Sequence, residues 1–183
     1  DLLLYQAPRG TQDILPEEQP YWHYLIDRIH RIAELYGYDQ IDTPTFEDTG
    51  LFTRGVGEAS DIVQKEMYTF QDRGNHSLTL RPEFTSPVVR AYLEHGMHTL
   101  PQPVKLYSVA PVFRYERPQA GRYREHHQFN VEAIGEADPS LDAEIISICW
   151  QLCQDIGFRG LGVQLNSIGC KKCRPEYHPS LKE

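Results

Sequence analysis

Residues 127–134 read HQFNVEAI, and polar and apolar side chains alternate along them. Successive side chains of a β-strand point to opposite faces of its sheet, so this stretch predicts a strand with one apolar and one polar face. The apolar face carries Phe129, Val131 and Ala133, and the polar face carries Gln128, Asn130 and Glu132. A polar row of this kind either faces solvent or lines a binding site.

A second predicted strand comes before this one, and an arginine-rich loop joins the two. It covers residues 104–115. Arg114 and Glu116, two positions apart at its C-terminal end, point to its polar side. The loop over residues 116–124 contains a glycine and three arginines. Arginine side chains hold phosphate oxygens through paired hydrogen bonds and stabilise charge that develops on them. The two strands therefore predict either a sheet floor with a cationic flap over a nucleotide, or a surface hairpin with exposed charges.

The rest of the chain predicts an α+β domain with a mainly antiparallel sheet flanked by helices. Between residues 22 and 36, apolar side chains recur with the spacing of one helix face, and Gly37 ends that helix. A second helix is expected over residues 141–157. The remaining strands are expected at residues 38–44, 77–81 and 161–165.

Two other patterns resemble ligand sites but lack the required arrangement. Residues 54–58, RGVGE, lack the third glycine of a dinucleotide-binding loop and are expected to form an ordinary loop. His126 and His127 are adjacent on a predicted strand, so their side chains point to opposite faces and are not expected to share a metal ion.

The composition of the 183 residues fits one ordinary domain, and its net charge of -8 argues against a surface that coats nucleic acid throughout. The arginines between Arg114 and Arg124 form a local cationic island, which is either a phosphate-binding site or a solvated loop. No apolar stretch approaches the roughly 20 residues needed to cross a bilayer. Residues 1–5 lack the features of a secretory signal, so a cytoplasmic protein without membrane contact is expected.

The four cysteines fall into two pairs. Cys149 and Cys153 lie among apolar residues at helical spacing and are expected to be small buried side chains. Cys170 and Cys173 form a CxxC pair, which supplies two of the four ligands of a structural zinc site. The pair is equally compatible with two thiols in a loop, since His178 or residues outside this sequence would have to complete a zinc site.

Several runs of residues together resemble the histidyl-tRNA synthetases, a family of class II aminoacyl-tRNA synthetases. The most specific are FRYERPQAGRYR at 113–124 and HQFNVE at 127–132, which resemble motif 2 and the substrate strand that follows it. The resemblance continues through PRGTQD at 8–13, KEMYTF at 65–70, LRPE at 80–83 and LNSIG at 165–169. It implies the N-terminal part of a class II catalytic core, with motif 2 at about 105–135 and motif 1, which builds the homodimer interface, at about 20–45.

The same resemblance implies a two-step reaction with L-histidine, ATP and tRNA(His) as substrates. ATP with Mg²⁺ would first activate histidine as histidyl-adenylate, and the histidyl group would then move to the 3′ end of tRNA(His). Arg114 would hold the α-phosphate and stabilise its transition state, while Glu116 and Arg122 would bind the adenine end and the outer phosphates. Arg117 and Gln119 match loop positions that meet the tRNA acceptor end.

For the amino acid, the resemblance implies a set of acceptors. Glu83, Thr85 and Gln128 would hold the α-amino group, and Glu132 would face the imidazole. This division is chemically sensible, because an ammonium requires acceptors and a carboxylate can receive the imidazole N–H.

The sequence departs from the family pattern at one pocket position and at its end. Phe84 stands where the family often has glycine, so a bulky ring is expected beside the amino-acid site. The sequence stops at Glu183, before the family's motif 3 and anticodon-binding domain, so the fragment alone is expected to be inactive. Two alternatives remain: the non-catalytic regulatory subunit of ATP phosphoribosyltransferase, which resembles this domain, and a binding module without chemistry. The presence of Arg114, Glu116 and Arg122 favours the enzyme.

Overall fold

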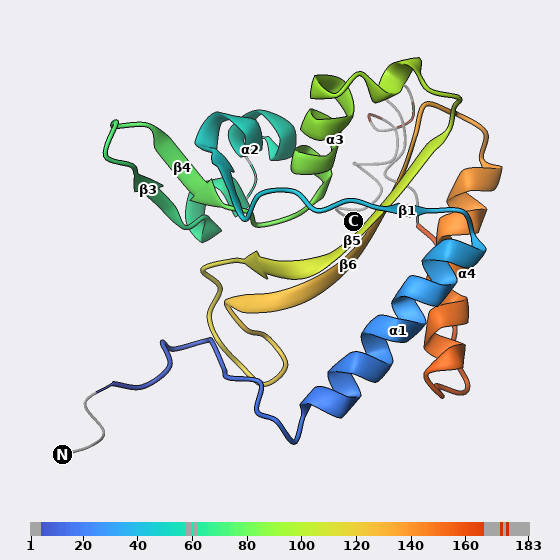
Figure 1. Cartoon of the computed structure of the whole chain (residues 1–183), viewed down its shortest axis with the longest axis horizontal. Helices are drawn as coiled ribbons and strands as arrows, with labels where there is room; N and C mark the ends of the chain where they lie inside the picture. The colour runs from blue at the N-terminus through green and yellow to red at the C-terminus, as the bar shows by residue number, and fades with distance from the viewer. Residues whose placement is uncertain (1–4, 58–59, 61, 167–172, 174, 176–183) are drawn as a thin grey trace.

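A computed structural model describes residues 5–57, 60, 62–166, 173 and 175. A long two-stranded hairpin forms its centre, with helices on both faces and a small second sheet beside α2 and α3 (Figure 1). The elements in chain order are α1 (Gln19–Leu35), β1 (Asp39–Gln40), β2 (Phe46–Asp48), α2 (Thr49–Val56), the π-helical turn η1 (Ile62–Glu66), β3 (Thr69–Gln71), β4 (Ser77–Leu80), α3 (Thr85–Glu94), the 3₁₀ turn η2 (Met97–Thr99), β5 (Val104–Phe113), β6 (Glu125–Ile134) and α4 (Ser140–Asp155).

The hairpin of β5 and β6 confirms the two strands predicted around the arginine-rich loop. Ten residue pairs join the strands antiparallel, from Val104 opposite Ile134 to Phe113 opposite Glu125. On the other edge of β5 lies β1, which runs parallel to it. The strand β5 ends at Phe113, two residues before the predicted end, because the amide of Tyr115 leaves the ladder and donates to the Glu66 carbonyl at 2.7 Å.

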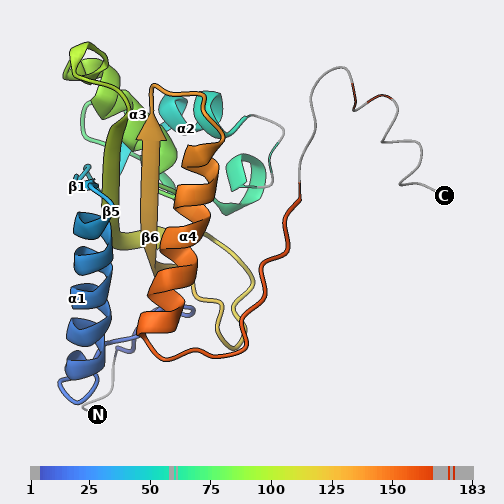
Figure 2. The same cartoon turned by 90° about the vertical axis from the view of Figure 1, so that its right-hand side faces the viewer.

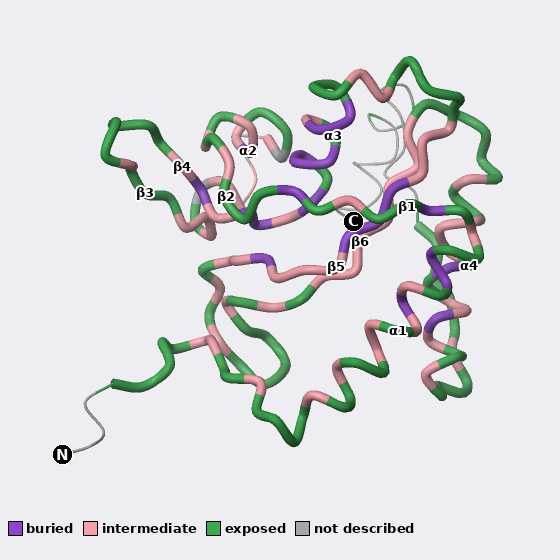
Figure 3. Tube along the Cα trace, in the orientation of Figure 1, coloured by how far each residue is buried: buried purple, intermediate pink, exposed green. Residues whose placement is uncertain are grey.

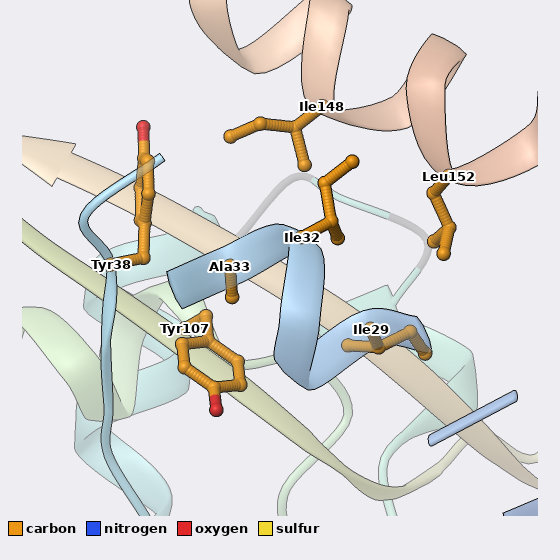
Figure 4. Packing of buried hydrophobic residues seen from close by; sticks show 7 residues of the cluster. All are labelled: Ile29, Ile32, Ala33, Tyr38, Tyr107, Ile148 and Leu152. Carbon is orange, nitrogen blue, oxygen red and sulfur yellow. The ribbon is translucent and has the colours of Figure 1, made fainter. Parts of the chain in front are cut away.

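One face of the hairpin is covered by α1 and α4, which lie side by side (Figure 2). The apolar row of β6 packs here, as its alternation predicted, together with Tyr107 and Val109 of β5. The buried members of this cluster are Ile29, Ile32, Ala33, Tyr38, Tyr107, Ile148 and Leu152 (Figure 4). Lys105 of β5 and Glu144 of α4 form an ion pair at its edge, and Tyr38 donates a hydrogen bond to the same carboxylate.

The opposite face of the hairpin packs against α3, so the polar row of β6 lies on this side. Phe84 and Val88 of the α3 segment form a second buried cluster with Leu106 and Val112 of β5. Purple, buried segments of the tube run along β5 and α3 in Figure 3. An ion pair between Arg90 of α3 and Glu47 of β2 ties the small sheet, ordered β2-β4-β3, to the same helix. Three of the four strand pairings in the described residues are antiparallel, which confirms the predicted fold class.

Some predicted elements were wrong in extent or kind. Residues 161–165 form no strand, because none of the strands in the described part of the chain pairs with them. The strand expected at 38–44 is reduced to Asp39–Gln40, and residues 54–56 of the expected loop form the last turn of α2. Cys149 is exposed rather than buried, and Cys153 is only partly buried. Ile148 and Leu152, four residues apart, occupy the core face of α4 instead.

Among the described residues, no helix is both long enough and apolar enough to span a membrane.

Candidate functional site

The polar row of β6 meets the first turn of α3 through a carboxylate. Thr85 donates its hydroxyl hydrogen to Glu132 Oε1 at 2.6 Å, and Asn130 Nδ2 donates to the same oxygen at 3.3 Å. Thr85 is exposed while Glu132 is partly buried, so the carboxylate lies at the rim of the space between strand and helix. Glu132 Oε2 makes no hydrogen bond to the described residues that would occupy it. This oxygen is therefore an available acceptor for a donor on a ligand.

Two further residues predicted to bind the amino acid lie near this carboxylate in the fold. Glu83 precedes α3 and accepts the backbone N–H of Ser86 at 3.0 and 3.3 Å, an arrangement that orients its carboxylate at the start of the helix. Gln128, two positions before Asn130 on the same face of β6, has a buried Oε1 without a hydrogen-bond partner among the described residues. A buried polar atom left unpaired costs about 1–3 kcal/mol, so Gln128 is poised to bind a polar ligand atom.

Arg114 lies immediately after β5 and is fixed by the segment that leads into α3. Its Nε donates to the Pro82 carbonyl at 2.8 Å, while its two terminal nitrogens make no hydrogen bond to the described residues. The four residues 82–85 therefore contact the residue that follows β5 and a residue of β6: Pro82 accepts from Arg114, and Thr85 donates to Glu132. A guanidinium fork and a carboxylate are thus held on either side of one short segment.

The loop between the strands holds its own charges together. Arg122 Nε lies 3.0 Å from Glu116 Oε2, and the backbone groups of Gln119 and Arg122 bond to each other at 2.9 and 3.3 Å. The turn between them uses Gly121, whose φ of +74° favours glycine. The Arg122 side chain is 60% exposed whereas that of Glu116 is 16% exposed, and the buried Glu116 Oε2 has no hydrogen-bond partner among the described residues, so this carboxylate can accept a donor on a ligand.

A buried cation lies beneath this site that the sequence analysis did not single out. Arg81 is 4% exposed, and its guanidinium donates to the carbonyls of Pro111 and Thr43 at 2.9 and 2.8 Å. It also lies over the ring of Phe84, 4.7 Å from the centroid. Burial lowers the pKa of Arg81 from its ordinary value. The residue joins the end of β4 to β5, next in sequence to Pro82, which receives Arg114.

Phe84 occupies the core rather than open space at the amino-acid site. It is 1% exposed and packs with Val88, Leu106 and Val112. The ring expected beside the pocket therefore fills the space between α3 and β5, where a glycine would leave Arg81 without its aromatic contact.

His126 and His127 occupy alternate faces of β6, opposite Val112 and Pro111 respectively. The ring of His127 packs on Trp22 of α1 with centroids 4.6 Å apart. Burial lowers the pKa of His127, and the nearby positive charge of Arg81 acts in the same direction. The His127 ring is thus a packing partner of Trp22.

The other predicted site residues lie in different surroundings. Arg117 and Gln119 are exposed on the loop, with side chains that the described residues leave available. Cys173 is exposed, whereas Cys170 lies outside the described residues. Among the residues that are described, no cluster of three or more His, Cys, Asp and Glu side chains is arranged to hold a metal ion.

The sequence and the fold are both similar to proteins of one family. A family model described as histidyl-tRNA synthetase matches residues 10–171. A histidine–tRNA ligase of Dehalococcoides mccartyi is 64% identical over 180 residues, which are 98% of this chain and 43% of that protein. A histidine–tRNA ligase of Clostridium kluyveri is 56% identical over 177 residues, covering 97% of this chain and 42% of its own length.

Solved structures give the same result. The crystal structure of the apo S. aureus histidyl-tRNA synthetase superimposes with a TM-score of 0.80 at 43% identity, over 97% of this chain and 41% of that one. A Bacillus halodurans protein described as an ATP phosphoribosyltransferase regulatory subunit/histidyl-tRNA synthetase gives a TM-score of 0.73 at 28% identity. That match covers 85% of this chain and 39% of the other. The chain spans less than half of the length of each of these relatives.

Proposed function

Because this chain belongs to the histidyl-tRNA synthetase family, we propose that it supplies the residues that bind histidine and the phosphates of ATP in a histidine–tRNA ligase. The observation that carries this proposal is the double contact of residues 82–85, with Arg114 on one side and Glu132 on the other. Histidine activation requires a cation at the α-phosphate and acceptors at the amino acid, within reach of each other.

In the first step, the histidine carboxylate attacks the α-phosphorus of ATP, and pyrophosphate leaves. MgATP is the nucleotide substrate, so the metal enters with it. The terminal nitrogens of Arg114 would hold the α-phosphate and stabilise the negative charge that grows on its oxygens in the transition state. Fixing Nε to Pro82 restricts the guanidinium before substrate binds, which reduces the ordering that the reaction itself requires.

The loop pair would bind the rest of the nucleotide. Glu116 and Arg122 are only 3.0 Å apart, so a bound ATP would separate them, with Glu116 at the adenine end and Arg122 at the outer phosphates. Arg122 can leave Glu116 because its own side chain is 60% exposed, so solvent reaches the guanidinium.

The amino acid would lie along the polar row. Glu83, Thr85 and the unpaired amide oxygen of Gln128 would surround the α-amino group, and Glu132 would accept the imidazole N–H. Asn130 and Thr85 both donate to one oxygen of Glu132, which keeps that carboxylate oriented and leaves its other oxygen for the ligand. A site that hydrogen-bonds a ligand N–H rejects amino acids without one, because a buried acceptor would be left unpaired.

Other parts of the proposal concern partners. Arg117 and Gln119, exposed on the loop, would meet the acceptor end of tRNA(His). The outward side of α1 carries Tyr21, which is 77% exposed, and would contribute to a homodimer through motif 1. A cytoplasmic location follows from the proposed role in protein synthesis. Zinc binding by Cys170 and Cys173 stays a prediction, and no step of the reaction uses it.

The proposal is tested by histidine-dependent ATP–pyrophosphate exchange in a full-length protein, meaning a chain as long as the curated relatives that contains these residues. We expect exchange with the wild type, its collapse in Arg114→Ala, and wild-type rates in Arg73→Ala, an exposed arginine in the β3–β4 turn. Absence of histidine-dependent exchange in the wild type would contradict the ligase and favour the regulatory subunit, the description that one structural relative carries. Retained exchange in Arg114→Ala would remove the role of Arg114.

A further inference from the structure

Arg124 closes the loop between the two long strands, and its contacts differ from those of the other loop arginines. Its backbone carbonyl accepts the amide of Arg114 at 2.8 Å, and its Nε donates to the Glu116 carbonyl at 3.2 Å. Its guanidinium lies over the ring of Tyr115, 3.8 Å from the centroid. The residue therefore holds three consecutive residues at the start of the loop, two of which are proposed to bind ATP.

The same residue binds the N-terminal segment, which passes beneath the loop before α1 (Figure 1). The amide of Arg124 donates to the Gly10 carbonyl at 2.7 Å, and Nη1 donates to the Arg9 carbonyl at 3.4 Å. A Cβ placed on Gly10 would lie 2.8 Å from Arg124 Cγ, and the φ of Gly10 is +87°. Only glycine fits at position 10 without strain or displacement of the Arg124 side chain.

We propose that Arg124 is a positioning residue: it clamps the loop between Gly10 and Tyr115 and thereby sets where Arg114 and Glu116 meet ATP. This inference rests on the proposed function. The guanidinium donates to two backbone carbonyls, those of Glu116 and Arg9, and stacks on an aromatic face. A planar, forked cation suits this combination, whereas the ammonium of lysine cannot bond to both carbonyls while stacking on the ring. The side chain is thus engaged in holding the loop in shape.

The amino-acid side chains are outside this clamp, since Thr85 lies on α3 and Glu132 on β6, away from the loop. Loss of the clamp should therefore impair the use of ATP and leave the binding of histidine intact. A general defect in folding would behave differently, because it would lower the amount of active enzyme and leave both KM values unchanged. Comparing the change in KM for ATP with the change in KM for histidine therefore distinguishes a positioning role from a role in stability.

The experiment uses Arg124→Ala, Arg124→Lys, Gly10→Ala and the control Arg73→Ala in the full-length protein. ATP–pyrophosphate exchange gives KM for each substrate and kcat. For Arg124→Ala we expect KM for ATP to rise, so that kcat/KM for ATP falls by about 10- to 100-fold, the loss that a displacement on the order of 1 Å produces, while KM for histidine stays unchanged. Arg124→Lys should show most of the loss in kcat/KM for ATP that Arg124→Ala shows. Gly10→Ala, which alters no charge, should also impair the use of ATP and leave KM for histidine unchanged.

Hydrogen–deuterium exchange over residues 114–124 supplies the second measurement, with faster exchange expected in Arg124→Ala and Gly10→Ala. Wild-type ATP kinetics in Arg124→Ala, full rescue by lysine, a fall in kcat with both KM values unchanged, or equal rises in KM for ATP and for histidine would overturn the positioning role. If the wild type shows no histidine-dependent exchange, the proposed ligase fails, while the deuterium exchange still decides the clamp. Unchanged loop protection in Arg124→Ala would then refute it.

Discussion

Replacing Arg81 with methionine should destabilise this chain although it removes a buried charge. Methionine fills much of the same volume and keeps contact with Phe84, but the carbonyls of Pro111 and Thr43 lose donors at 2.9 and 2.8 Å. A buried carbonyl left unpaired costs about 1–3 kcal/mol; the Thr43 bond is buried and the Pro111 bond is partly buried, so roughly 2–6 kcal/mol is the upper range for the two. Relief from burying a guanidinium offsets part of this loss. We expect a net loss of about 2–4 kcal/mol.

Urea unfolding of the 183-residue chain, followed by circular dichroism, measures this free energy directly. With a urea dependence on the order of 2 kcal/mol per molar, the midpoint should fall by about 1–2 M. Arg81→Lys provides the matched control, since its single ammonium keeps the charge but reaches only one side of the former fork. We expect it to recover less than half of the loss. Stability equal to wild type in Arg81→Met would refute the reasoning, because it would show that the two carbonyls do not depend on this donor.

Three further substitutions probe other contacts. The Asp72 carboxylate raises the pKa of His76 through a hydrogen bond of 2.9 Å, so Asp72→Asn should lower that pKa. NMR titration of the His76 ring measures the change, and an unchanged pKa would show that Asp72 and His76 do not interact in solution. The contribution of the pair is complete below the unfolded pKa of histidine and disappears as pH rises through the raised folded value, so the stabilities of wild type and variant should converge at alkaline pH. Burial and Glu144 raise the pKa of Tyr38, so the wild type should lose stability above a pH of about 10, where the unfolded phenol ionises. Tyr38→Phe should lose less stability when the free energy of unfolding is compared at neutral and alkaline pH. Thr85→Val removes a donor to Glu132 at 2.6 Å, a bond to a charged group worth about 1.5–3 kcal/mol; KM for histidine in the full-length protein should rise by about tenfold or more, with Thr85→Ser close to wild type.

The parts of the fold that the sequence predicted are those with long, regular patterns. The strand β6 alternates over most of its length, and α1 repeats apolar residues over several turns, so both were placed within a few residues. The polar and apolar faces of β6 were also assigned correctly, because the rule depends only on parity along the strand.

Short or atypical elements could not be predicted in the same way. The strands β2 and β3 have three residues each, too few for alternation to show. The helix α3 contains Pro87 in its first turn and has Phe84, which cannot cap, at its N-cap position; Val88 and Ala91 are buried against the rest of the domain and stabilise it. Residues 161–165 alternate as a strand would, yet a strand requires a hydrogen-bonded neighbour, which sequence alternation does not provide.

The residues of the candidate site also fall into those that the sequence identified and those that it did not. Residue types and the family resemblance identified Glu132 and Thr85, and the structure brings them into contact. The sequence analysis gave Arg81 no role and named Arg124 only as part of the cationic island, since each has a backbone carbonyl acceptor far away in sequence, 30 residues for Pro111 and 115 for Arg9. Every residue has a backbone carbonyl, so no pattern of residue types in the sequence predicts which carbonyl an arginine will bond to.

The ten-pair register of β5 and β6 also determines where this domain can tolerate a change of length. A single residue inserted in β6 just before Gln128 would exchange the two faces of the residues that follow it, placing Gln128 and Glu132 against α1 and α4 and the apolar row in the binding site. An insertion near Gly121, at the tip of the loop, would leave all ten pairs intact. A change of length at that tip would therefore preserve the two strands while altering the loop that is proposed to bind ATP.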